Sequence, residues 1–137
     1  MLPSRQEYEN LIYTLPDAYS SIKVSTLRLI PTGAKAGRLV GTITFSKGIE
    51  LHVFEAIDLD VGEILDYGYT VYRGEEKEYW YDPQEHPDVP ALASTYPHHK
   101  HIHPNIKRNR VPAPNISFTE PNLPFLIEEI ERELLLK

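Results

Sequence analysis

The sequence contains no cysteine, which excludes disulfide bonds, thiolate metal ligands and a cysteine nucleophile. A chain without cysteine suits the reducing cytosol, so we expect a cytoplasmic protein. No apolar run approaches the ~20 residues that a membrane-spanning helix needs. The first residues, Met1 to Glu7, also lack the apolar stretch of a signal peptide. We therefore expect neither export nor a membrane partner.

The sequence has no excess of positive charge, because 20 acidic residues outnumber 14 Lys and Arg and the formal net charge is −6. This balance argues against a protein that coats nucleic acid without specificity. The distribution is uneven, however, since the stretch from His98 to Arg110 has no acidic residue and four basic ones: Lys100, Lys107, Arg108 and Arg110. We expect a local positive face on an acidic body.

The length and the spacing of apolar residues predict one α+β domain over residues 1–137. Two domains would each be too short to bury a core. Ser4 and Glu7 form a capping box ahead of an N-terminal helix that runs up to Pro16, and an apolar stripe beginning at Leu123 predicts a C-terminal helix. Alternating and β-branched segments predict an antiparallel meander of about five strands, at 22–30, 38–45, 49–57, 63–73 and 78–82.

A long proline- and histidine-rich segment, Tyr81 to Arg110, follows the last of these strands. Nine of the twelve prolines lie between Pro83 and Pro124, and five of the six histidines lie between His86 and His103. Proline lacks a backbone N–H and restricts the residue before it, so we expect an irregular segment without a continuous helix or a central strand. Such segments in compact domains are often functional.

Three interpretations compete for the histidines. They could lie in a solvated loop, or His99, His101 and His103 could project to one side of an extended run and bind a metal together with Asp82 or His86. The third interpretation is metal-free acid–base chemistry on a phosphodiester, because an imidazole pKa near ~6.5 allows one histidine to accept a proton while another donates. We favour the third and expect no cofactor, because a helical metal motif is absent and the charge of Lys100 would repel a dication.

Two features of the strands bear on the same question. If Ile49, Leu51 and Val53 line the core, alternation places Glu55 on the core face, where its carboxylate needs a partner. A broken register would instead leave Glu55 exposed, and both alternatives stay open. The tyrosines of the expected fourth strand are typical of a sheet surface, with base stacking as the alternative role: Tyr67, Tyr69 and Tyr72.

Several of these motifs together resemble the TumE family, small toxin components of bacterial and archaeal toxin–antitoxin pairs. The resemblance rests on Glu55 near a strand end, the aromatic run Tyr67-Gly68-Tyr69, Tyr81-Asp82 followed by His86-Pro87, the run Thr95 to His101 and the closing helix. It extends from about Arg38 to the C-terminus. The positions that it marks are Glu55, Tyr69, Asp82, His86, His98, His99 and His101.

The resemblance implies a toxin that acts on RNA and has a cognate antitoxin. We predict a metal-independent ribonuclease whose catalytic residues converge at one end of the sheet: His98, His99, His101, Glu55 and Asp82. Substrate contacts are expected from Lys100, Arg108, Arg110, Tyr69, Tyr81 and His86. The alternative is a non-catalytic module that binds an antitoxin or a metal through the same segment. A homodimer is compatible with either function, and the sequence does not identify the RNA target.

Overall fold

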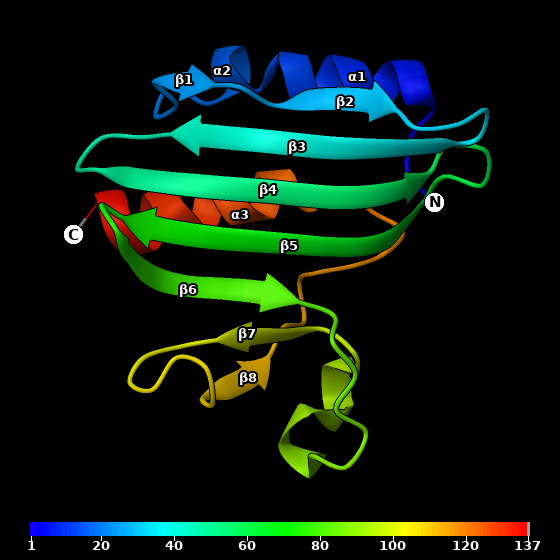
Figure 1. The fold of residues 1–137 in the computed structure, drawn as a ribbon. Helices are drawn as coiled ribbons and strands as arrows, with labels where there is room; N and C mark the ends of the chain where they lie inside the picture. The colour runs from blue at the N-terminus through cyan, green and yellow to red at the C-terminus, as the bar shows by residue number, and fades with distance from the viewer. Residues whose placement is uncertain (137) are drawn as a thin grey trace.

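The structure is a computed structural model that describes residues 1–136. Within these residues, eight strands form one antiparallel sheet in the order β1-β3-β4-β5-β6-β7-β8, with β2 also paired to β3 (Figure 1). The strands are β1 (Val24–Ser25), β2 (Arg28–Pro31), β3 (Ala36–Thr44), β4 (Ile49–Asp58), β5 (Glu63–Arg73), β6 (Glu76–Asp82), β7 (His99–His101) and β8 (Arg110–Pro112).

The helices lie at the two ends of the described chain, as expected. Helix α1 (Arg5–Tyr13) begins at the predicted capping box, in which the Glu7 N–H donates to Ser4 Oγ and the Ser4 N–H donates to Glu7 Oε1, both at 3.2 Å. Pro16 does not end the helical region; it lies in the first turn of the short helix α2 (Leu15–Ala18). Helix α3 (Leu123–Ile130) continues as a π-helical turn, η2 (Glu131–Leu135), and a 3-10 helix, η1 (Pro90–Thr95), precedes β7.

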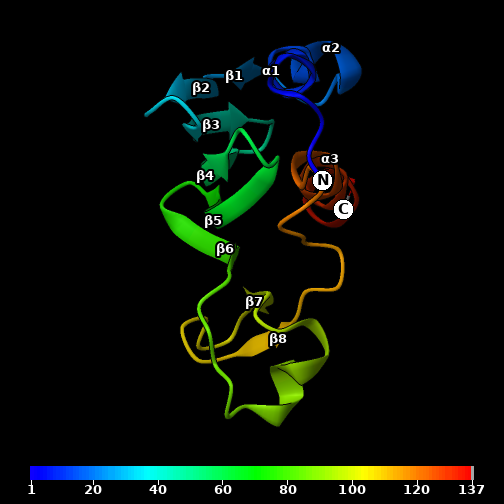
Figure 2. The same cartoon turned by 90° about the vertical axis from the view of Figure 1, so that its right-hand side faces the viewer.

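All three α-helices lie on the same side of the sheet, whereas the other face of β3 to β6 carries no helix (Figure 2). Strand alternation explains this arrangement. Along β4, the buried positions are Ile49, Leu51, Val53, Glu55 and Ile57, and residues of one parity share one face. These side chains pack with α1 and α3 into the core. The opposite face of β3 to β6 consists of half-buried and exposed side chains.

The expected strand order and the two hairpins are confirmed, but the expected number of strands is too low. The segment expected as one strand at 22–30 is split into β1 and β2. The proline- and histidine-rich segment contains β7, and β8 begins at its last residue, Arg110. The prediction that the segment holds no central strand is wrong, because β7 lies between β6 and β8. Its prolines flank β7, and Pro112 ends the edge strand β8, where a missing N–H interrupts no further pairing.

Gly41 explains the split between β1 and β2. Its φ is +143°, and a Cβ built there would lie 2.7 Å from Leu27 Cα and from the Thr26 carbonyl oxygen. The backbone at residues 26 and 27 therefore approaches β3 more closely than any other residue type would allow.

Gly41→Ala is expected to lower the free energy of unfolding by roughly 2–4 kcal/mol, because the clash involves backbone atoms and the φ is unfavourable for alanine. Gly68→Ala is the matched control on β5, since no atom lies within 4 Å of a Cβ built there. Its effect should stay below about 1 kcal/mol. Chemical denaturation of both variants measures the difference, and equal effects would contradict this account of the split strand.

Candidate functional site

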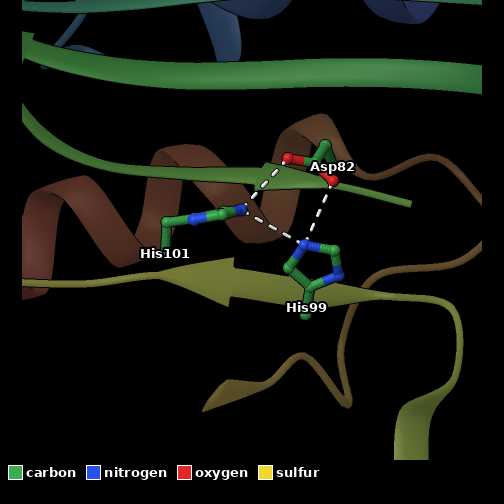
Figure 3. A group of neighbouring side chains, drawn as sticks. All are labelled: Asp82, His99 and His101. Carbon is green, nitrogen blue, oxygen red and sulfur yellow. Dashed lines mark hydrogen bonds and ion pairs between the residues drawn. The ribbon is translucent and has the colours of Figure 1, made fainter. Parts of the chain in front are cut away.

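Asp82, His99 and His101 converge at the junction of β6 and β7, and we call these three residues the triad (Figure 3). Asp82 is the register partner of His99 on the neighbouring strand. His99 Nε2 lies 3.1 Å from Asp82 Oδ1, His101 Nε2 lies 3.2 Å from Asp82 Oδ2, and the two Nε2 atoms are 3.2 Å apart. The triad is covered, because His99 and His101 are buried, while Asp82 keeps 25% of its side chain exposed.

Strand alternation brings the triad together and separates it from Lys100. His99 and His101 lie two residues apart, so both face the side of the sheet that Asp82 faces. Lys100 faces the helix side, where its Nζ lies 3.0 Å from Glu129 Oε2 of α3. The Tyr81 hydroxyl donates to the same carboxylate. The charge of Lys100 is therefore compensated on the opposite face of β7.

Backbone carbonyls fix the orientation of both imidazoles. His99 Nδ1 donates to the Pro97 carbonyl oxygen at 3.1 Å, and His101 Nδ1 donates to the Ile106 carbonyl oxygen at 3.0 Å. A carbonyl only accepts hydrogen bonds, so each Nδ1 carries a hydrogen. The Trp80 ring stacks on His101 with centroids 4.0 Å apart. Both rings thus present Nε2 to the centre of the triad.

The protonation equilibria of the site follow from burial and these contacts. Partial burial alone would raise the pKa of Asp82, but the contact with His99 and the hydrogen bonds that the Gln84 N–H and the Trp80 indole donate outweigh it and hold that pKa below its ordinary value. Because its pKa is lowered, Asp82 is an ionised carboxylate near neutral pH. Burial lowers the pKa of His101, which favours the neutral imidazole.

His86 and Arg110 form a second group beside the triad. The His86 ring contacts the His99 ring edge-on, with centroids 5.1 Å apart. Arg110 Nη1 donates to the His86 ring at 2.7 Å. Desolvation and then the charge of Arg110 lower the pKa of His86, which favours the neutral form. His86 also lines a surface hollow of about 350 Å³ together with Pro87, Val89, Ala93 and Tyr96.

Two of the predicted catalytic residues lie outside the triad. Glu55 faces the core, which is one of the two alternatives that the sequence left open, and its partners are two tyrosines. The Tyr8 and Tyr69 hydroxyls each donate to its carboxylate at 2.5 Å, and its side chain is 0% exposed. His98 Nδ1 instead shares a hydrogen bond with the Tyr67 hydroxyl at 2.6 Å.

The residues predicted to contact the substrate do not lie together on one surface. Tyr69 and Tyr81 are buried on the helix face, where RNA bases could not stack on them, while Arg108 is exposed. The uncovered face of the sheet instead carries three half-buried aromatic side chains: Phe54, Tyr72 and Trp80. Sequence reasoning missed Phe54 and Trp80. Strand alternation could have placed Trp80 beside the site, because Trp80 lies two residues before Asp82 and must share its face of the sheet.

The fold and the triad describe a small mixed helix–strand protein with a histidine–carboxylate cluster between the adjacent strands β6 and β7. The family model described as "Toxin TumE" matches residues 13–134. The chain therefore belongs to the TumE toxin family, and the match begins well before Arg38, where the sequence resemblance was expected to begin. No curated protein and no solved structure matches the chain. Among the described residues, no helix has the length and apolar character required to cross a membrane.

Proposed function

We propose that this chain is the toxin of a toxin–antitoxin pair and that it cleaves RNA at the triad. The convergence of Asp82, His99 and His101 carries this proposal. A carboxylate and two imidazoles within 3.2 Å of one another are a chemically competent group. Purely structural histidines do not require such an arrangement.

The surroundings of the triad favour RNA as the substrate. Phe54 and Tyr72 lie on the same face of the sheet as Asp82, and aromatic faces are the surfaces on which unpaired bases stack. Arg38 lies over the Phe54 ring at 5.4 Å, and Lys77 lies over the Trp80 ring at 4.9 Å. The uncovered face thus combines base-stacking surfaces with cations that can contact phosphates.

The proposed reaction uses the 2′-hydroxyl of the RNA itself. A new P–O2′ bond forms and the P–O5′ bond breaks, while a proton leaves O2′ and another arrives at O5′. The products are a 2′,3′-cyclic phosphate and a 5′-hydroxyl end. The reaction needs a proton acceptor and positive charge beside the phosphorus. Metal-free acid–base chemistry, which the sequence predicts, would supply that charge from a protonated histidine; a bound cation would supply it equally.

A non-catalytic module is the second candidate function. The near-complete burial of His99 and His101 favours it, because a substrate would reach the triad mainly through Asp82. Such a module would bind its antitoxin through the same segment and leave RNA intact.

Expression of the chain without a partner is expected to slow host growth and to fragment cellular RNA, because an RNA-cleaving toxin acts as soon as it folds. Co-expression with the product of an adjacent antitoxin-like reading frame should restore growth. Growth curves and RNA gels from the same cultures measure both effects. Slow growth with intact RNA would favour the non-catalytic module, and normal growth at full soluble expression would contradict a toxin.

A further inference from the structure

The triad brings together hydrogen-bond acceptors with no proton among them when both histidines are neutral. Each Nδ1 already carries its hydrogen for a backbone carbonyl, so each Nε2 of a neutral imidazole has only a lone pair. Asp82 contributes two further acceptors, Oδ1 and Oδ2. Four acceptors at contact distance repel one another unless a positive charge lies between them.

The distances within the triad match those between ligands of one metal ion. Around an ion with metal–ligand bonds of about 2.1 Å, adjacent ligand atoms are about 3.0 Å apart at octahedral angles and about 3.4 Å apart at tetrahedral angles. The two Nε2 atoms are 3.2 Å apart, and each lies near a different oxygen of the Asp82 carboxylate, at 3.1 Å for His99 and 3.2 Å for His101. A ligand atom from each of the three residues lies within 4.8 Å of the others.

The second layer of contacts is also that of a metal site. Ligating histidines usually donate their other ring nitrogen to a carbonyl or carboxylate, which fixes the tautomer. His99 and His101 both do so, and the Trp80 indole donates to Asp82 Oδ2 at 2.9 Å. Lys100, whose charge the sequence suggested would repel a dication, is paired with Glu129 on the opposite face.

We propose that Asp82, His99 and His101 bind one first-row divalent transition-metal ion, with Zn²⁺ and Mn²⁺ as the representative ions. Two imidazoles and one carboxylate suit this class of ion, whereas Mg²⁺ prefers oxygen ligands. Three protein ligands leave positions for water or a phosphate oxygen, which is the arrangement of catalytic metal sites. The binding of the ion does not depend on the proposed RNA cleavage.

The test uses the full chain after treatment with chelator and exchange into metal-free buffer. Titration calorimetry with Zn²⁺, Mn²⁺ and Mg²⁺ at one fixed pH is expected to give one Zn²⁺ or Mn²⁺ per chain and no Mg²⁺ binding. Asp82→Asn and His101→Gln should weaken Zn²⁺ binding at least about 10-fold. His103→Gln is the matched control, because His103 is exposed and its Nε2 contacts the Lys77 carbonyl oxygen, outside the triad; the Zn²⁺ affinity of this variant should equal that of the wild type.

Circular dichroism verifies that each variant is folded, and Co²⁺ provides a readout on the wild type alone. Co²⁺ in the triad should give visible absorption bands that Zn²⁺ abolishes. The proposal would be overturned if the chain bound neither Zn²⁺ nor Mn²⁺, or if Co²⁺ gave no visible bands. It would also be overturned if His103→Gln weakened Zn²⁺ binding as much as the triad variants, since that result would indicate an adventitious ion only. Ion binding without RNA cleavage would retain the metal site and remove the proposed function. RNA cleavage in chelator by a chain that binds no ion would retain the proposed function and remove the metal site.

Discussion

Replacing His101 by glutamine is expected to slow RNA cleavage about 10²–10⁴-fold, the usual effect of removing a group that transfers protons or holds the reactive ion. His101 Nε2 contacts both Asp82 and His99, whereas its Nδ1 is already committed to a backbone carbonyl. Glutamine cannot present a ring nitrogen at the same point. Cleavage should therefore fail whether the positive charge at the triad is a proton or a metal ion.

His103→Gln serves as the control for that experiment, because it changes the same residue type two positions away. His103 is exposed and outside the triad, and a glutamine amide can still reach the Lys77 carbonyl oxygen. Rates are measured on one labelled RNA, with protein concentration and folding matched by circular dichroism. Equal rates for His101→Gln and the wild type would remove His101 from the site, and a large loss in both variants would indicate a general effect on the segment.

Stability is expected to fall as the pH rises from about 5 to about 8, because Glu55 is buried in the core. Burial raises the pKa of Glu55 from 4.5 to about 7, although the hydrogen bonds from Tyr69 and Tyr8 partly offset this effect. Between these two pH values the folded chain retains a proton that the unfolded chain releases. The free energy of unfolding therefore falls through this window, by on the order of 3 kcal/mol in total.

Glu55→Gln isolates this contribution, because glutamine has nearly the same shape and no proton to release. The variant should match the wild type near pH 5 and exceed its stability near pH 8, with the gain developing between about pH 4.5 and 7. Glu75→Gln, at an exposed position of the β5–β6 turn, should show no such window. Denaturation curves measured across this pH range give the free energy of unfolding of each chain. A raised pKa of Glu55 would be contradicted if the wild type became more stable relative to Glu55→Gln as the pH rises.

The parts of the fold that follow from local pattern were predictable. The capping box at Ser4, the apolar stripe after Leu123 and the two hairpins each depend on residues close together in the chain. Alternation along β4 gave the core position of Glu55 as one of two open alternatives, and this is the one that the structure shows. These features need no knowledge of long-range pairing, because the local period alone determines which face of each element is buried.

The pairing of β7 was not predictable from the sequence, since three residues between prolines form a strand only because β6 offers a partner. That pairing determines which histidines meet Asp82. It selects His99 and His101 by parity and turns Lys100 toward α3, whereas the sequence alone treated the whole run as one cluster. The partners of Glu55 were also not predictable from the sequence, because Tyr8 lies 47 residues away in the chain.

The most direct test of RNA cleavage at the triad uses purified wild-type chain and Asp82→Asn on the same 5′-labelled single-stranded RNA. Asparagine keeps the size of the aspartate and removes the charge that both histidines face. We predict discrete fragments with 2′,3′-cyclic phosphate ends from the wild type, and intact RNA from an equally folded Asp82→Asn. RNA that remains intact with the wild type, or is cut at the same rate by both chains, would contradict the account.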